Sequence, residues 1–234
     1  MRKTKIVCTI GPACNTEEIL SEMCLAGMNV ARLNFSHGTH EDHKINIDRI
    51  KKVREKLGLP IAILLDTKGP EYRIKTFADG KIQLKEGDSF IFTSEDVIGD
   101  QNRVSVNYEA LPDEMAPGDR ILLNNGLLIF EVEEIRGREI VCRVIAGGEL
   151  SNRKSMSFPG KVMQQPYLSA QDKEDIRFGI ENGVDYIACS FVSCKQDLDD
   201  VRSFLDAHTT DDNISLIAKI QSSDIIIAKK VGNT

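Results

Sequence analysis

Continuous apolar runs alternate with amphipathic helices in the first part of the chain, and this alternation restricts the sequence to a small set of folds. Strands buried on both faces are predicted at residues 4–10, 29–35 and 60–66. The helices predicted between them cover Glu17–Ala26 and 41–57. Strands and helices in this order build βαβ units, so we expect a parallel sheet.

The pattern changes after Gly69, where short runs separated by turn residues replace the helices. Such runs are typical of β-strands connected by hairpins. They occur at Lys81–Leu84, Ser89–Thr93, 103–106, Arg120–Leu123, 127–135 and 139–145. The Asn-Asn-Gly sequence at 124–126 favours a hairpin, because these residues tolerate positive φ angles. We therefore predict an inserted all-β barrel domain at residues 70–165.

The first pattern then returns, with Ser169 as the expected N-cap of a helix and Asp172 completing a capping box. Helices are predicted at 169–182 and 195–207, and strands at 184–191 and 214–220. The predicted fold is α/β: an incomplete TIM-type βα barrel of about five strands, with the β domain inserted after strand three. The barrel parts, at 1–69 and 166–234, hold little more than half of the roughly 250 residues of a complete barrel.

The composition of the chain argues against several classes of protein. The chain has 30 Lys and Arg against 36 Asp and Glu, a net charge of −6 that disfavours a general nucleic-acid binder. It contains no apolar run near the roughly 18 residues of a membrane span and no signal-peptide pattern, so we expect a cytoplasmic protein without a membrane partner. The six cysteines form no C-x-x-C pair, and we expect reduced thiols.

Polar side chains lie where the predicted strands end. Arg32, Asn34 and Ser36 share a parity, so in an extended strand they project from one face. Asp66 ends the next strand, and Lys219 ends the fifth. The carboxyl ends of barrel strands form the mouth where active sites are built. The alternative is a set of polar strand ends exposed to solvent.

These residue types together indicate phosphoryl transfer. The cations are Arg32, Arg73 and Lys219, and the hard oxygen donors are Asn34, Ser36 and Asp66. Cations at one rim neutralise the charge that spreads over phosphoryl oxygens, and hard oxygens bind metal cations.

Several motifs then point to a family. They lie at residues 5–12 (Lys-Ile-Val-Cys-Thr-Ile-Gly-Pro), 27–38 (Gly-Met-Asn-Val-Ala-Arg-Leu-Asn-Phe-Ser-His-Gly), 65–71 (Leu-Asp-Thr-Lys-Gly-Pro-Glu), 174–179 and 218–220. From residue 3 to about 220 the chain resembles the N-terminal part of pyruvate kinase. The resemblance implies a barrel with an inserted β-barrel lid. It also implies glycolytic phosphoryl transfer from phosphoenolpyruvate to ADP, giving pyruvate and ATP, with Mg²⁺ and K⁺.

The resemblance also implies a role for individual residues. Arg32 would contact the substrate phosphate, and Lys219 would stabilise the transferring phosphoryl group and the developing enolate. The residues implied in substrate or nucleotide binding are Arg32, Asn34, His37, Arg73, Lys154 and Ser190. The implied K⁺ ligands are the side chains of Asn34, Ser36 and Asp66 and the backbone carbonyl of Thr67.

Some positions depart from the family pattern. Gln221 stands where the family has a Mg²⁺-binding Glu, and an amide lacks the charge that attracts this cation. Ser193 replaces a usual Arg, and residues 124–126 and 155–160 differ from the usual lid sequences. The motif carrying the second Mg²⁺ carboxylate is absent after Gln221, so we expect an impaired Mg²⁺ site and no turnover by this chain alone.

Four functions are therefore compared. In the first three, the chain is an active pyruvate kinase, a non-catalytic remnant, or a half-barrel completed by a second copy or a separate C-terminal chain. Another phosphoenolpyruvate-using barrel enzyme is disfavoured, because the insertion after strand three is not expected there. Open sheet edges in a half-barrel favour self-association.

Two polar clusters have simpler interpretations. His37, His40 and His43 are spaced i, i+3 and i+6, but His37 and His43 would lie about 240° apart on a helix. His37 also precedes the expected N-cap Thr39, so a solvated helix entry is favoured over a metal cluster. The acidic residues at 197–200 are interpreted as a solvated helix face.

Overall fold

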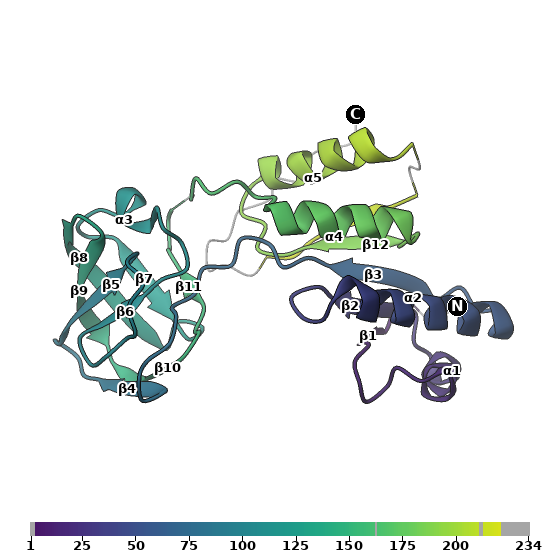
Figure 1. Ribbon diagram of the computed structural model, residues 1–234, viewed down its shortest axis with the longest axis horizontal. Helices are drawn as coiled ribbons and strands as arrows, with labels where there is room; N and C mark the ends of the chain where they lie inside the picture. The colour runs from purple at the N-terminus through teal and green to yellow at the C-terminus, as the bar shows by residue number, and fades with distance from the viewer. Residues whose placement is uncertain (1–2, 162, 211–212, 221–234) are drawn as a thin grey trace. The chain divides into compact units, whose positions relative to one another are not determined.

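The computed structural model describes residues 3–161, 163–210 and 213–220. The described residues form two compact units (Figure 1). The first unit runs to Pro70 and resumes at Pro166, and the second is Glu71–Gln165. Each unit has its own hydrophobic core.

The first unit is a parallel sheet with helical connections. Its strands, in the order of the sheet, are β1 (Val7–Thr9), β2 (Val30–Asn34), β3 (Ala62–Asp66), β12 (Tyr186–Cys189) and β13 (Ser215–Ala218). Every pairing between them is parallel. Its helices are α1 (Glu17–Ala26), α2 (His40–Leu57), α4 (Ala170–Glu181) and α5 (Lys195–His208). The α/β class predicted from the sequence is confirmed.

Capping residues set the helix boundaries in this unit. The Thr16 side chain accepts the Ile19 N–H at the start of α1, and Gly27 ends that helix with φ +116°. Capping boxes begin α2 at Thr39 and α4 at Ser169, as predicted for α4. Local sequence therefore encodes these helices strongly, because each end satisfies its own backbone groups.

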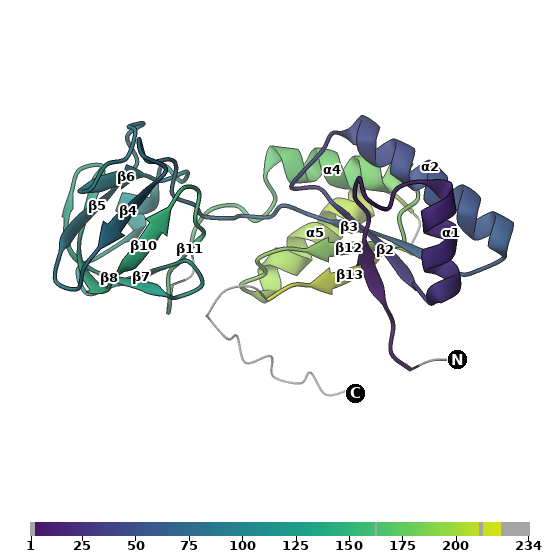
Figure 2. The ribbon, with the colours of Figure 1, turned by 90° about the horizontal axis from the view of Figure 1, so that it is seen from below.

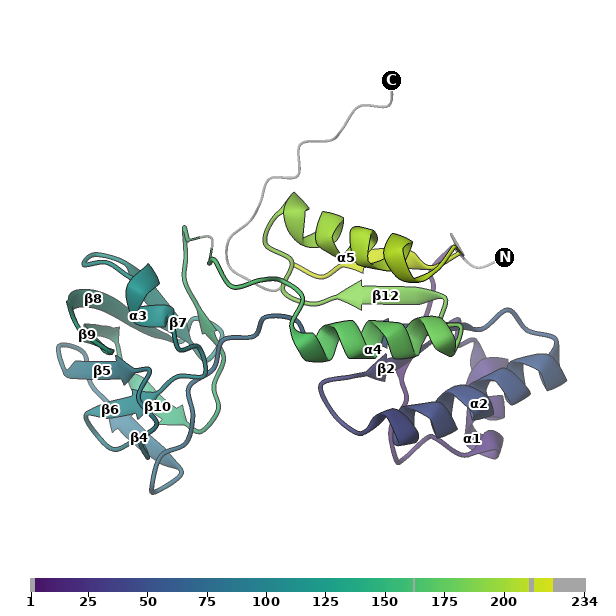
Figure 3. The same cartoon turned by 45° about the horizontal axis from the view of Figure 1, so that its top comes forward.

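The two faces of the sheet have different roles. The strand residues that contribute to the core belong to one face and pack against all four helices: Ala31, Leu33, Ile63, Leu65, Ile187 and Cys189. The sheet curls, and the helices lie outside it (Figure 2). In the view of Figure 3, α4 and α5 lie on either side of β12. The two helices contact each other, and Arg177 of α4 lies 5.4 Å from the ring centroid of Phe204 of α5. The opposite face carries Arg32 and Asn34.

The second unit is built mainly of strands. They are β4 (Lys81–Leu84), β5 (Ser89–Thr93), β6 (Arg103–Ser105), β7 (Arg120–Leu123), β8 (Leu128–Arg136), β9 (Glu139–Ala146), β10 (Gly148–Ser151) and β11 (Met156–Ser157). One sheet has the order β11-β7-β8-β9-β5-β6, and β10 pairs with β4 in a second sheet. A short helix, α3 (Leu111–Glu114), also lies here. Its core centres on Phe90, Phe92 and Phe130, each 0% exposed.

The predicted hairpin between β7 and β8 is confirmed, with Leu123 paired to Leu128. The turn uses positive φ at Asn124 (51°), Asn125 (58°) and Gly126 (83°). These angles explain why the sequence has Asn-Asn-Gly here, since other residues pay a steric cost at positive φ.

Two of the three histidines around the start of α2, His40 and His43, are packed against other side chains, so the expectation of a solvated helix entry is wrong for these two. His43 is 7% exposed, stacks on Phe35 with ring centroids 4.0 Å apart, and contacts the His37 carbonyl oxygen at 2.9 Å. His40 lies 2.6 Å from Asp175 of α4. Spacing along one helix could not show that α4, more than 120 residues later in the chain, covers this entry.

The acidic stretch of α5 is only partly a solvated face. Asp197 accepts hydrogen bonds from the backbone N–H groups of Ser193 and Cys194, at 2.7 and 3.0 Å. It therefore caps the start of α5, whereas Asp200 is exposed.

The six cysteines are free thiols, as expected. Cys142 and Cys189 are fully buried in β9 and β12, where they act as small apolar side chains. Burial raises the pKa of the Cys189 thiol to about 12. In the part of the chain that the structure describes, no helix combines the length and apolar character needed to cross a bilayer.

Candidate functional site

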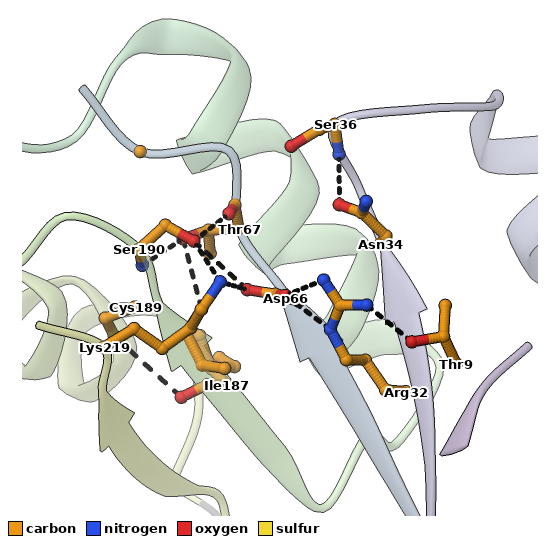
Figure 4. A network of polar contacts seen from close by, with 12 residues as sticks. Thr9, Arg32, Asn34, Ser36, Asp66, Thr67, Ile187, Cys189, Ser190 and Lys219 are labelled. Atoms are coloured by element: carbon orange, nitrogen blue, oxygen red, sulfur yellow. Dashed lines mark hydrogen bonds and ion pairs between the residues drawn. The ribbon is translucent and has the colours of Figure 1, made fainter. Parts of the chain in front are cut away.

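A buried carboxylate lies between two cations at the carboxyl ends of the strands (Figure 4). One oxygen of Asp66 accepts a hydrogen bond from Nε of Arg32 at 2.6 Å. The other accepts from Nζ of Lys219 at 2.7 Å. The Asp66 side chain is 1% exposed, whereas Arg32 and Lys219 are 29% and 27% exposed. The three charges sum to +1, and the accessible part of the cluster is positive.

Strand register explains this convergence. Asn34 of β2 is the direct register partner of Asp66 of β3. Arg32 lies two residues before Asn34 and therefore on the same face. Lys219 follows β13 directly, and its N–H donates to the Cys189 carbonyl at 2.9 Å. Parallel strands end at the same edge of a sheet, so polar residues far apart in sequence meet there.

Ser36 does not continue the strand, so the expectation that it shares an extended face with Arg32 and Asn34 is wrong. The strand β2 ends at Asn34, and a turn begins at Phe35. The Ser36 N–H donates to the Asn34 side-chain oxygen at 3.1 Å, which bends the chain through a local side-chain contact. Ser36 is exposed beyond this turn.

Thr67 and Ser190 form a buried layer next to Asp66. They are both 3% exposed. The Ser190 Oγ lies 2.6 Å from the Thr67 carbonyl oxygen, 3.1 Å from Asp66 Oδ1 and 2.9 Å from Lys219 Nζ. The Tyr167 hydroxyl donates to the Ser190 carbonyl at 2.7 Å, and burial raises the pKa of this tyrosine. All these groups belong to the first unit.

The remaining predicted residues lie elsewhere. His37 is exposed in the turn after β2. Its carbonyl oxygen contacts the His43 ring, and its N–H donates to the Asn34 carbonyl at 3.2 Å. Arg73 and Lys154 belong to the second unit, where Arg73 pairs with Glu71. The Lys154 carbonyl accepts the Ile74 N–H at 3.1 Å. Gln221 lies outside the described residues.

Sequence reasoning missed two supporting residues. The Thr9 hydroxyl accepts a hydrogen bond from Arg32 at 2.6 Å, and these two residues are register partners. The sequence signal that could have indicated this contact is that Thr9 is a polar residue at the end of the first strand. The Asp172 carboxylate accepts the Gly69 N–H at 3.1 Å, where Gly69 has φ +66°. A Cβ at Gly69 would lie 2.5 Å from the Ser190 carbonyl oxygen.

The oxygen atoms of the four residues predicted as K⁺ ligands have the chemistry that a monovalent cation requires. They are an amide oxygen, a hydroxyl, a carboxylate and a backbone carbonyl, from Asn34, Ser36, Asp66 and Thr67. Hard oxygen donors of this kind suit K⁺ and other hard cations. Within the described ranges, no three His, Cys, Asp or Glu side chains gather as metal ligands.

Comparison with known proteins decides the family. The family model described as "Pyruvate kinase, barrel domain" matches residues 1–229. The chain belongs to the pyruvate kinase family. The pyruvate kinases of Staphylococcus saprophyticus and of Staphylococcus aureus strain USA300 are both 46% identical to it over 226 residues. These matches cover 96% of this chain, which spans 38% of the length of each of these two relatives. The resemblance read from the motifs is thereby confirmed.

Proposed function

We propose that the chain takes part in pyruvate kinase-type phosphoryl transfer, in which phosphoenolpyruvate and ADP give pyruvate and ATP. This is a kinase activity of glycolysis. The observation that carries the proposal is the pair of partly exposed cations, Arg32 and Lys219, held by one buried carboxylate. Family membership supports the same reaction.

The arrangement suits a transferring phosphoryl group. Asp66 neutralises one of the two positive charges and fixes both side chains, so one net positive charge remains accessible to an anion. Arg32 contacts the substrate phosphate. Lys219 stabilises the phosphoryl group in transit and the enolate that forms as the phosphate leaves. Fixed charges of this kind lower the barrier because they need no reorganisation during the reaction.

Two metal cations belong to the proposal. Asn34, Ser36, Asp66 and the Thr67 carbonyl would hold K⁺, which would supply positive charge to balance that of the phosphoryl group. Mg²⁺ supplies further charge neutralisation in this reaction class. Gln221 takes a position that is Glu in the family pattern, and an amide binds Mg²⁺ more weakly than a carboxylate does. The Mg²⁺ site is therefore proposed to be impaired.

We assign the two units to two parts of the enzyme. The first unit is proposed as about five strands of a TIM-type barrel, at residues 1–69 and 166–234. The second is proposed as the inserted β-barrel lid at 70–165. The family resemblance supports a role in nucleotide binding for Arg73 and Lys154 of this unit and, separately, for His37 of the first unit. The ligands are phosphoenolpyruvate or pyruvate and ADP or ATP, in the cytoplasm.

One observation favours an alternative, in which this chain alone is non-catalytic or needs a second chain. In the described residues, β1 and β13 are the outer strands of a parallel sheet, and Val7 and Ile217 on them are 51% and 39% exposed. Parallel sheets are normally covered on both faces. A second copy or a complementary C-terminal chain would cover these strands and complete the site.

Binding of phosphoenolpyruvate tests the proposed site directly. Isothermal titration calorimetry in KCl is expected to detect binding by the unaltered chain and a roughly ten- to hundredfold weaker affinity for Arg32→Gln, because a charged donor to phosphate is lost. Arg54→Gln is the matched control, since Arg54 also pairs with an aspartate, Asp185, but lies in helix α2 and not on the strand that carries Arg32. Equal affinity of Arg32→Gln and the unaltered chain would contradict the proposal.

A turnover assay tests whether this chain is active alone or, as in the alternative, is non-catalytic or needs a second chain. A coupled assay with Mg²⁺ and K⁺ is expected to detect no phosphoryl transfer by the chain alone, and Gln221→Glu alone is not expected to restore it. Full activity of the unaltered chain would exclude the alternative.

A further inference from the structure

Ser190 uses each of its polar atoms to connect parts of the site. Its N–H donates to the Thr67 hydroxyl at 3.2 Å, and its carbonyl accepts from the Tyr167 hydroxyl at 2.7 Å. Its Oγ contacts Thr67, Asp66 and Lys219. The residue is 3% exposed. A buried residue whose N–H, carbonyl and hydroxyl groups all have hydrogen-bond partners in the protein is held in place, and little of its surface is accessible to a substrate.

The hydrogen atoms in this network can be assigned from chemistry. A lysine ammonium only donates, so Lys219 donates to the Ser190 Oγ across the 2.9 Å contact. The single Ser190 hydroxyl hydrogen then has two acceptors, the Thr67 carbonyl at 2.6 Å and Asp66 Oδ1 at 3.1 Å. The carbonyl contact is shorter, and Asp66 Oδ1 already accepts from Lys219. The hydrogen bonds therefore run from Lys219 to Ser190 to the Thr67 carbonyl.

This direction has a consequence for Lys219. Among the contacts of the described residues, two of the three ammonium hydrogens are held, one by Asp66 and one by Ser190, which leaves one for an anion. Without the Ser190 oxygen, the Asp66 contact alone would hold the ammonium group, and the long lysine side chain would regain rotational freedom. The second contact therefore fixes where the charge is placed.

We propose that Ser190 is a positioning residue that orients the Lys219 ammonium group, and that it does not itself bind the substrate. Its role in phosphoryl transfer rests on the proposed function of Lys219. The orientation of Lys219 does not rest on that function, and it can be measured without any ligand.

The test measures how fast an amine-reactive reagent, trinitrobenzenesulfonate, modifies Lys219, with peptide mass spectrometry to locate the modification. Lys81, exposed in the second unit, is the internal reference. Ser190→Ala is expected to raise the relative rate at Lys219 about tenfold, which corresponds to the loss of one hydrogen bond to a charged group. Ser190→Cys is expected to raise it too, because a thiol of similar shape is a weak acceptor. Ser105→Ala removes another buried serine, 0% exposed in the second unit, and is expected to leave the rate unchanged.

Affinity for inorganic phosphate is measured on the same proteins by calorimetry. A several-fold loss in Ser190→Ala supports the positioning role. If the unaltered chain fails to bind phosphate, the proposed function fails, and the Lys219 rate still decides the role of Ser190. An unchanged Lys219 rate in Ser190→Ala would overturn the inference. A Lys219 modification rate in Ser190→Cys equal to that of the unaltered chain would also overturn the inference, because packing alone would then hold Lys219. If Ser190→Ala does not fold, Ser190→Cys carries the test.

Discussion

At the scale of single residues, Asp66 is the group on which the site's geometry depends. It is almost fully buried between two cations, so its removal leaves both of them without their common partner. Asp66→Asn is expected to lower the free energy of unfolding by about 2–3 kcal/mol, below the full cost of breaking a buried pair because both cations are partly exposed. Chemical denaturation measures the change.

A surface pair provides the control for this prediction. Asp48 pairs with Lys44 at 2.5 Å, and its side chain is 56% exposed. Asp48→Asn is expected to change the stability by no more than about 0.5 kcal/mol, since exposed i,i+4 pairs contribute little. Equal effects of the two substitutions would mean that Asp66 is not the centre of a buried charge cluster.

At the scale of helices and strands, prediction from sequence succeeded where local signals set the boundaries. Helix α1 has the predicted bounds, Glu17–Ala26, and is capped by Thr16 and Gly27, because capping acts within a few residues. The pairing of β10 with β4 was not predicted, because Gly147 and Gly148 carry no strand signal. A Cβ at Gly147 would lie 2.4 Å from the Leu84 carbonyl oxygen, so this glycine is explained only by a partner strand distant in sequence.

The candidate site could likewise be predicted only where local sequence signals determine it. Arg32 and Asn34 could be placed on one face by parity, and their convergence with Asp66 and Lys219 followed from parallel strands ending together. The Ser190 network could not be derived, because it depends on three chain segments meeting in space. Local periodicity gives the orientation of a side chain and leaves its distant partners undetermined.

The packing of α2 on β2 predicts a dependence of stability on pH. Burial lowers the pKa of His43 below its usual 6.5. The unfolded chain therefore binds a proton more readily, and stability falls as the pH drops below about 6.5 toward the lower pKa of the folded state. Denaturation of His43→Gln at pH 7.5 and 5.5 is expected to show a smaller loss on acidification than the unaltered chain shows.

Exposed His208 supplies the matched control, since its side chain contacts only the Phe204 carbonyl and ring among the described contacts. His208→Gln is expected to keep the full pH dependence. If His43→Gln lost as much stability on acidification as the unaltered chain, another group would be responsible.

At the scale of the whole molecule, each unit has its own hydrophobic core. In the second unit, Phe90 and Phe92 of β5 and Phe130 of β8 pack against one another in the interior. In the first unit, among the described residues, the outer strands β1 and β13 each pair on one side only. Unpaired strand edges with exposed apolar side chains are the surfaces on which chains associate.

We therefore expect self-association of this chain. Sedimentation equilibrium at tens of micromolar is expected to give a concentration-dependent mass above the 26.1 kDa of one chain. Val7→Lys, on the outer strand β1, is expected to shift the mass toward the monomer, because a charge at a strand edge opposes pairing. Leu25→Lys changes a side chain that is 70% exposed on α1 and is expected to have no effect. A single species of monomer mass at every concentration would contradict this expectation. It would mean that the edges of β1 and β13 remain stable in water without a partner.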